Sequence, residues 1–200
     1  MKVAVYSGSF NPIHKGHIAV IGYLLDVAGY DRVYLIVSPH NPFKEASLAD
    51  SGEARLAAVR EAIGRNGLQD RVLVDDIEFG MPLPSYTIRT LDALQEREPE
   101  NRFTLVIGGD NVSRMLEWKE AERLMEQYGL VVYPREGFNM VRDARILKEK
   151  HRNAERMFES GDRHRPFHIR LLKDAPLVSI SSSQIREMAS RGEDVTPLLA

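Results

Sequence analysis

Short runs of β-branched and aromatic residues alternate with helix-like segments along the chain. The runs read KVAVYS, RVYLIVS, RVLVDDI, FTLVIGG, GLVVYP and FHIRLL. Most are apolar nearly throughout, as expected of strands that helices bury on both faces, and the alternation is typical of βαβ units. The sequence therefore predicts an α/β fold, a Rossmann-like doubly wound parallel sheet, in a single domain over residues 1–200.

Segments between these runs carry helical patterns. In GEARLAAVREAI, for example, Leu56, Val59 and Ile63 recur at helical spacing with charges between them. Residues 136–166 differ, because their charges are mixed in sign and their apolar residues are few, so we expect an exposed helical insertion there, with a lid or a subunit contact as the alternative. The predicted helices span 15–27, 52–65, 85–95, 117–127 and 181–191.

Composition excludes several classes of protein. The chain lacks cysteine, which rules out disulfide scaffolds, thiolate zinc sites and cysteine nucleophiles. No apolar stretch approaches the roughly 20 residues that span a bilayer, so we expect a cytoplasmic protein with no membrane partner. The net charge of -2 gives no general reason to bind nucleic acid. Phosphate binding would therefore need local groups of donors, and a homo-oligomer is left open.

The first strand runs directly into the segment SGSFNPIHKGH. In a parallel sheet, ligands bind beyond the carboxyl ends of the strands, where helix N-termini offer unpaired N–H groups and a partial positive charge. Gly8 and Gly16 allow close backbone approach. The dinucleotide pattern G-x-G-x-x-G and the Walker pattern are both absent. This turn is therefore predicted to bind phosphate by a different arrangement.

His14 and His17 present two imidazoles to one side of this turn. Zinc would need further ligands at recognisable spacing, and the sequence has no H-E-x-x-H. A second reading gives the histidines a structural role in capping or filling the turn. The third, which we favour, has both imidazoles donating hydrogen bonds to phosphate oxygens and stabilising charge that develops during phosphoryl or nucleotidyl transfer.

A second candidate phosphate site lies in VSISSSQIREM. Ser181 and Gln184 form a capping-box pattern at the start of a helix. Ser182 and Ser183 add hydroxyls at the helix mouth, and Arg186 brings a planar, permanently charged group. Alone, the segment would read as a serine-capped helix with a surface arginine. Beside the first site, it reads as a second set of phosphate donors.

These motifs carry a family resemblance. GSFNPIHKGH resembles the H-x-G-H signature of the nucleotidyltransferase superfamily, and ISSSQIR resembles its C-terminal I-S-S-T-x-I-R element. PSYTIRTLDAL, VIGGDN and LEWK are similar to segments of the nicotinate-nucleotide adenylyltransferase branch. The resemblance covers residues 1 to about 135 and 168 to 190, with the motifs in the family's order.

The resemblance implies transfer of AMP from ATP to nicotinate mononucleotide, with Mg²⁺ accompanying ATP. The two histidines would meet the ATP phosphates, Arg186 and the serine turn the β and γ phosphates, and Asp110 the adenosine ribose. The implied catalytic residues are His14, His17, Lys44 and Arg186. The implied ATP site comprises Gly8, Ser9, Phe10, His14, His17, Asp110, Ile180, Ser182, Ser183 and Arg186.

The same resemblance implies a mononucleotide site. Trp118 would stack on the nicotinate ring, although a core position is the alternative, and backbone N–H groups near Ser85 would favour a carboxylate over an amide. The sequence around Lys44 departs from the family's pattern, because Pro42-Phe43-Lys44 replaces the usual P-H-K. Lys44 would be a further phosphate contact, and a solvated loop lysine is the alternative. The implied residues are Asn11, Lys44, Ser85, Tyr86, Thr87, Trp118 and Arg135.

Other functions fit these residues less well. The phosphopantetheine branch typically has threonine where His14 stands, and cytidylyltransferases lack PSYTIRTL. A nicotinamide-preferring enzyme is harder to separate on sequence. A nucleotide sensor without turnover would not require His14, His17 and Arg186 together, and a flavodoxin-like domain without ligand would leave two phosphate-type helix mouths unexplained.

Overall fold

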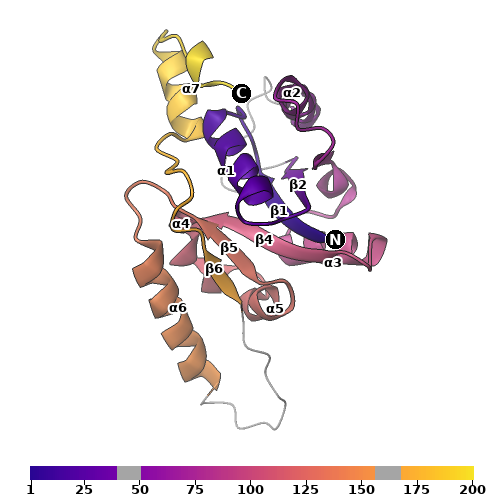
Figure 1. Ribbon diagram of the computed structural model, residues 1–200, viewed down its shortest axis with the longest axis vertical. Helices are drawn as coiled ribbons and strands as arrows, with labels where there is room; N and C mark the ends of the chain where they lie inside the picture. Colours follow the sequence, from indigo (N-terminus) through magenta and orange to yellow (C-terminus); the bar gives the residue numbers. More distant parts are fainter. Residues whose placement is uncertain (40–50, 156–167) are drawn as a thin grey trace.

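The computed structural model describes residues 1–39, 51–155 and 168–200. Six strands form one sheet in the order β3-β2-β1-β4-β5-β6, and every neighbouring pair is parallel. The Rossmann-like parallel sheet predicted from the sequence is therefore confirmed (Figure 1). The strands are β1 (Lys2–Gly8), β2 (Arg32–Val37), β3 (Val72–Asp75), β4 (Arg102–Gly108), β5 (Leu130–Tyr133) and β6 (Ile169–Leu171).

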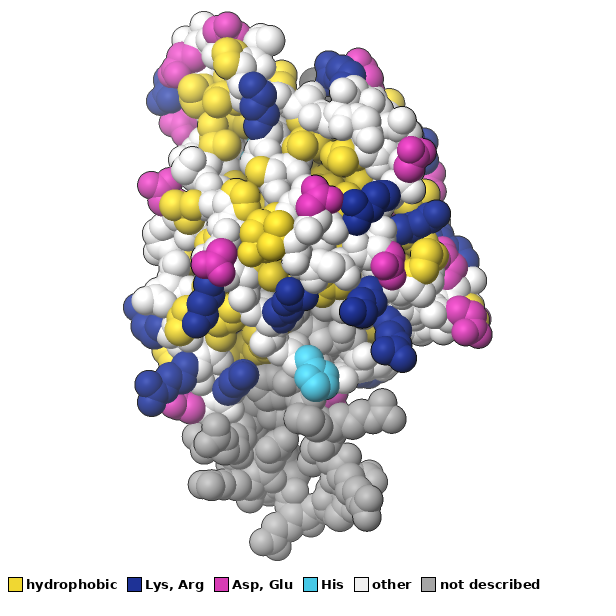
Figure 2. Space-filling model, viewed as in Figure 1, with side chains coloured by type: hydrophobic (Ala, Val, Ile, Leu, Met, Phe, Trp, Pro, Cys, Tyr) yellow, Lys and Arg dark blue, Asp and Glu magenta, His cyan; other side chains and the backbone are white. Residues whose placement is uncertain are grey.

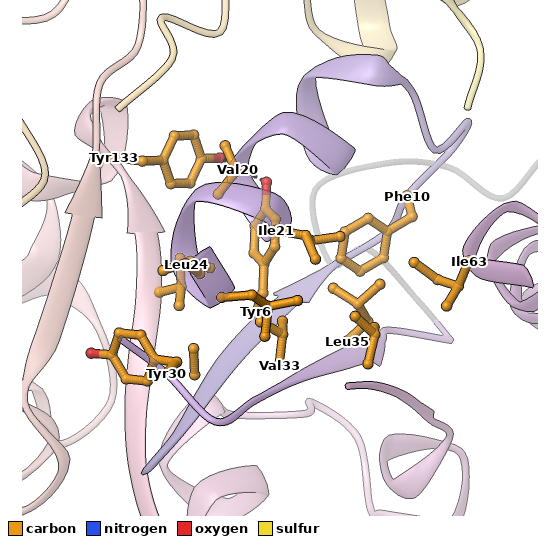
Figure 3. Packing of buried hydrophobic residues seen from close by; sticks show 14 of the residues in the cluster. Tyr6, Phe10, Val20, Ile21, Leu24, Tyr30, Val33, Leu35, Ile63 and Tyr133 are labelled. Atoms are coloured by element: carbon orange, nitrogen blue, oxygen red, sulfur yellow. Dashed lines mark hydrogen bonds between the residues drawn. The ribbon is translucent and has the colours of Figure 1, made fainter. Parts of the chain in front are cut away.

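Successive strand residues feed two separate cores on opposite faces of the sheet. In β1, Ala4 and Tyr6 enter one core, whereas Val3 and Val5 enter the other. The first core lies under α1 (Lys15–Asp26) and α2 (Gly52–Arg65), and Figure 3 shows its packing around Tyr6, Val33 and Leu35. The second lies under α3 (Thr87–Arg97) and the segments from α4 to α6. Burial on both faces explains the nearly continuous apolar runs in the sequence.

The helix predicted over residues 117–127 is broken, so that expectation was wrong. Trp118 follows the 3-10 turn η2 (Met115–Glu117) in an extended conformation, with φ -76° and ψ 149°, and Glu120 is left-handed at φ 53°. Regular structure resumes as α5 (Ala121–Arg123) and the π-helical turn η3 (Leu124–Tyr128). The other helical elements are η1 (Ile77–Gly80), α4 (Gly109–Val112), α6 (Met140–Glu155), α7 (Ser182–Ser190) and η4 (Thr196–Leu198).

Within the predicted insertion, α6 is helical, but it is not exposed on all sides. Met140, Ala144 and Leu147 are buried in the second core, while Val141 and Ile146 face outward. The spacing of the buried residues places them on one helix face. Figure 1 shows α6 along one side of the sheet, so this part of residues 136–166 belongs to the fold's layer of helices.

The strand order reverses between β1 and β4, and ligands of such sheets bind at this point beyond the carboxyl ends of the strands. The amino ends of the strands lie on the opposite side of the sheet and are lined by cationic side chains. A cavity of about 770 Å³ there is lined in part by Arg102, Lys148, His168 and Arg170. Figure 2 shows Lys and Arg side chains over the lower part of the visible face. Among the predicted site residues that the structure describes, none lines this cavity, so the candidate site lies at the carboxyl ends of the strands. Among the described residues, no helix is long and apolar enough to cross a membrane.

Candidate active site

The two histidines of the first turn cap helix α1. His14 is the N-cap residue, and its Nδ1 atom accepts a hydrogen bond from the Gly16 N–H at 3.2 Å. The His14 N–H in turn donates to Nδ1 of His17 at 3.1 Å. Because both Nδ1 atoms accept, each neutral ring carries its proton on Nε2. The capping role raised from the sequence is thus present, and it leaves one N–H donor per ring for a ligand.

Burial keeps this pair uncharged in the free protein. His14 is 1% exposed, and burial, with a smaller contribution from the Arg135 cation, lowers its pKa to about 4. The pKa of His17 is also lowered well below 6.5, first by burial and then by His14 and Arg135. The ring centroids lie 3.8 Å apart, a geometry that disfavours two imidazolium ions. At neutral pH the turn therefore offers two Nε2–H donors without adding positive charge.

The start of α7 meets this turn, although the two are far apart in sequence. The Ser182 hydroxyl donates to the Pro12 carbonyl oxygen at 2.9 Å, and the Arg186 guanidinium donates to the Asn11 carbonyl oxygen. Figure 1 shows α7 beside α1. The predicted capping box is also present, because the Ser181 hydroxyl accepts from the Gln184 N–H at 3.2 Å. The two candidate phosphate segments therefore form one surface.

Gly16 makes this approach possible. A Cβ atom at this position would lie 2.9 Å from Cγ1 of Val178 and 3.0 Å from the His14 ring. Both distances are shorter than side chains in packed interiors tolerate. The second glycine of the motif is therefore required by the closeness of the C-terminal segment as well as by the turn itself.

Asp110 and Arg135 lie beside the histidine pair. Nε of Arg135 is 3.6 Å from Oδ1 of Asp110, an ion pair beyond hydrogen-bond distance. That carboxylate oxygen is buried without a hydrogen-bond partner among the described residues. Arg135 also donates to the Ile180 carbonyl oxygen at 3.4 Å. Arg135 thus lies with the predicted ATP residues, and it does not line the cavity that contains Trp118.

Aromatic side chains of the core pack against the turn that carries the two histidines. The hydroxyls of Tyr6 and Tyr133 are 3.0 Å apart, and Figure 3 shows the two labelled side chains near each other. The rings of Tyr6 and Phe10 pack edge to face, and Phe10 packs in the same way on His17. Phe10 is 3% exposed and takes a left-handed φ of 44°. Its ring belongs to the core, so any contact of Phe10 with ATP would come from its main chain.

A second cavity, of about 490 Å³, opens at the N-terminus of α3. Its lining includes Ser85, Tyr86 and Thr87. Helix α3 has no side-chain N-cap and no acidic residue in its first turn, so it presents N–H groups to this cavity. The Ser85 hydroxyl oxygen is buried, and no partner for it occurs in the described parts of the chain. The cavity therefore offers unsatisfied polar groups of the kind that bind an anionic substituent.

Trp118 lies between this cavity and the first turn. It is half-buried, packs against the second core and also lines the 490 Å³ cavity, so the core contact is present and stacking on the nicotinate ring stays a prediction. A third cavity, of about 270 Å³, reaches from Gly8 and Ser9 to the same tryptophan. The two cavities share Thr87, Asn111 and Trp118. The break in the predicted helix places Trp118 at their junction.

The structure adds residues that the sequence analysis did not select. Asn111, Arg114 and Lys119 line the larger cavity. Asn111 directly follows Asp110, and Lys119 directly follows Trp118. Their positions next to predicted site residues could have indicated them in the sequence. Lys44 lies outside the described residues, and its contribution stays a prediction.

Comparison with known proteins agrees with this geometry. The cytidylyltransferase-like family model matches residues 5–188. A probable nicotinate-nucleotide adenylyltransferase of Bacteroides fragilis is 38% identical over 97% of this chain and 85% of its own length. One of Flavobacterium johnsoniae is 34% identical over 100% of this chain and 92% of its own. The chain belongs to the nicotinate-nucleotide adenylyltransferase family. The resemblance drawn from the sequence is therefore confirmed.

Solved structures support the fold of this adenylyltransferase-family chain. The Plasmodium falciparum nicotinic acid mononucleotide adenylyltransferase complexed with NaAD matches with a TM-score of 0.71 at 16% identity, over 98% of this chain and 87% of that one. A putative nicotinate-nucleotide adenylyltransferase from Vibrio parahaemolyticus matches with a TM-score of 0.64 at 22% identity, over 100% and 93%.

Proposed function

We propose that the chain transfers AMP from ATP to nicotinate mononucleotide, releasing nicotinate adenine dinucleotide and pyrophosphate, as a cytoplasmic single-domain enzyme of NAD biosynthesis. The observation that carries this proposal is that the two cavities are neighbours, because Thr87, Asn111 and Trp118 line both. A ligand in one cavity would lie next to a ligand bound at the histidine turn. Such proximity supports a direct reaction between two bound substrates.

In this reaction a phosphate oxygen of the mononucleotide forms a bond to the α-phosphorus of ATP. The bond from that phosphorus to the bridging oxygen breaks, and the electron pair leaves with pyrophosphate. No nucleophile of the chain is needed. The residues would act by positioning the substrates and by stabilising charge on the α-phosphate and pyrophosphate.

The Nε2–H groups of His14 and His17 suit this task. As neutral donors they strengthen their hydrogen bonds as charge develops on the phosphate oxygens. Arg186 and the N-terminus of α7 would hold the β and γ phosphates, since a guanidinium and a helix N-terminus both favour phosphate. We infer that Asp110 holds the ribose, because its buried Oδ1 atom needs a donor.

Mg²⁺ is inferred to arrive bound to ATP. This ion usually keeps several waters and takes substrate phosphates as ligands, with one or two carboxylates at most. When bound, it neutralises charge on the phosphate oxygens. Asp110 is the carboxylate beside the histidine pair. Since we assign it to the ribose, the phosphates of ATP and water molecules would be the ligands of Mg²⁺.

Recognition of nicotinate would depend on the N-terminus of α3. The carboxylate of the pyridine ring would accept hydrogen bonds from backbone N–H groups at Thr87 and from the Ser85 hydroxyl, while Trp118 stacks on the ring. A carboxamide carries no charge and brings an NH₂ group that meets these donors unfavourably. The site is therefore proposed to prefer the acid to the amide.

The test compares the two mononucleotides. Pyrophosphate release is measured with ATP and Mg²⁺ and either nicotinate or nicotinamide mononucleotide. We expect kcat/KM to be at least about a hundredfold higher for the acid. A protein heated above its unfolding temperature provides the blank. Equal rates would disprove acid selectivity, and the absence of pyrophosphate with both would disprove the proposed reaction.

A further inference from the structure

Glu78 is a buried carboxyl group with hydroxyl groups of three different segments around it. It lies in η1, three residues after the end of β3, and is 3% exposed. The Thr90 hydroxyl of α3 donates to its Oε1 at 2.8 Å. Burial raises the pKa of this carboxyl group, and the nearby hydroxyls of Ser38 and Ser7 lower it by a smaller amount; the two serine hydroxyls are 3.5 Å apart. No described residue pairs a cation with Glu78, and a carboxylate is costly to bury without one, so this arrangement of three hydroxyls needs an explanation.

The three hydroxyls belong to segments that form the candidate active site. Ser7 immediately precedes Gly8 at the end of β1, and Ser38 immediately follows β2. Both serines line the 270 Å³ cavity that reaches Trp118. Thr90 lies three residues after Thr87, which lines both cavities. The Glu78 carboxyl group therefore lies next to two serines that line the 270 Å³ cavity. It also binds Thr90 of α3, the helix whose N-terminus lines both cavities.

Arg55 of α2 makes a similar connection nearby. It is 8% exposed, and its guanidinium donates to the carbonyl oxygens of Ser9 at 2.7 Å, Ser38 at 2.8 Å and Pro39 at 2.8 Å. The loops after β1 and β2 are thus joined to each other by the arginine and to α3 by the glutamate. In this part of the fold, buried hydrogen bonds connect the site segments. Such bonds fix the relative positions of the segments more closely than apolar packing alone would.

We propose that Glu78 is a positioning residue for adenylyl transfer: by holding Ser7, Ser38 and Thr90 together, it fixes the ATP-binding turn relative to the N-terminus of α3, which binds the mononucleotide. This inference rests on the proposed function. It assigns to Glu78 no contact with substrate, and it predicts that loss of the connection impairs alignment more than binding.

The reason lies in the geometry of direct transfer. The attacking oxygen must lie in line with the α-phosphorus and the leaving oxygen, and a displacement of about 1 Å can lower the rate about a hundredfold. Each substrate has its own binding groups, on α7 and α1 for ATP and on α3 for the mononucleotide. A small shift of α3 against β1 would therefore leave both sets of contacts in place while the reacting atoms separate.

Thr90 provides a matched pair of variants. Thr90→Val removes the hydroxyl with little change of volume, whereas Thr90→Ser keeps the hydroxyl and removes a methyl group. We expect Thr90→Val to lower kcat at least about tenfold, with both KM values within about threefold of wild type. Thr90→Ser should keep kcat within about threefold. If the two variants have the same kcat, or if Thr90→Val changes only KM, the proposal is wrong.

Coupling to Glu78 gives a second criterion. If Thr90 acts through the carboxylate, the loss of kcat in Glu78→Met, which has no oxygen to accept the Thr90 hydrogen bond, should not increase further when Thr90→Val is added. Asp143→Asn is the control, because Asp143 is a buried carboxyl group on α6 that lines neither cavity. Its kcat should match wild type. Multiplicative losses in the double variant would overturn the proposal.

Hydrogen exchange tests the same connection without turnover. The Ser38 N–H donates to the Gly8 carbonyl oxygen at 3.0 Å, so its exchange rate reports the contact between the two loops. We expect exchange at least about tenfold faster in Thr90→Val and unchanged in Thr90→Ser. Unchanged exchange in both variants would refute the positioning role even if the wild-type protein released no pyrophosphate, a result that would disprove the proposed function separately.

Discussion

Replacing His14 by asparagine should remove a pH dependence of stability. The Oδ1 atom of asparagine can take the place of Nδ1 and accept from the Gly16 N–H, and asparagine is a favourable N-cap residue. His14→Asn should therefore keep the cap of α1 while removing a group that titrates. The Nε2–H donor is lost, so turnover should fall at least about a hundredfold.

The magnitude follows from the buried imidazole. The pKa of His14 falls from 6.5 to about 4 on folding. Between these values the unfolded chain binds more protons than the folded one, so stability falls as the pH is lowered through this window and is fully present above pH 6.5. Each pH unit changes the free energy of unfolding by about 1.4 kcal/mol. From pH 7 to pH 5, His14 should account for a loss of about 2 kcal/mol.

Urea denaturation at pH 7, 6 and 5 measures this effect, with fluorescence of the single tryptophan as the signal. Carboxyl groups and His17 contribute to the pH dependence of both proteins, so the relevant quantity is the difference between wild type and variant. We expect the wild type to lose about 2 kcal/mol more than His14→Asn over this range. Parallel losses would show that His14 is not held neutral by burial.

Three further changes test other parts of the site. Trp118→Ala should raise KM for the mononucleotide at least about tenfold and leave KM for ATP unchanged in steady-state assays. Gly16→Ala should lower Tm and weaken ATP binding because its Cβ would meet side chains at 2.9 and 3.0 Å, whereas Gly22→Ala in the same helix, with open space around it, should raise Tm. Arg186→Gln should weaken ATP binding at least about tenfold by calorimetry, and the exposed Arg191→Gln should not.

The sequence was sufficient for the sheet and for the starts of α1 and α7. Strands that are buried on both faces read as apolar runs, and capping residues mark helix starts, so β1, β2 and the beginning of α7 were visible in the sequence. The sequence analysis paired Ser182 and Arg186 with the first turn as a second set of phosphate donors, and the structure shows that the two segments are in contact. Local patterns were reliable where local and tertiary preferences agreed.

Other features depended on contacts that a linear pattern does not contain. LEWKEAERLMEQ has helical composition, but the chain breaks at Trp118 and Glu120 so that the indole can reach the cavities. Met140, Ala144 and Leu147 have helical spacing that could have indicated a buried face, yet the surrounding charges concealed it. Tertiary burial thus overrode composition in both segments.

The polar network behind the site gave even less signal. Glu78 stands in RVLVDDIEFG as one acid among several, and its role depends on hydroxyls contributed by β1, the β2 loop and α3. Likewise, histidine is not a preferred N-cap residue, so the use of both Nδ1 atoms in capping α1 follows only from the folded geometry. Such roles arise from elements that meet in space.

The junction between α7 and the first turn has a consequence for the order in which the protein is made. Arg186 leaves the ribosome 175 residues after Asn11, the residue whose carbonyl oxygen it binds. All six strands precede it. A nascent chain can therefore complete its sheet before the contact between α7 and the first turn can form. The surface that joins the two candidate phosphate segments is thus completed late, when α7 docks onto a turn that was synthesised near the start of the chain.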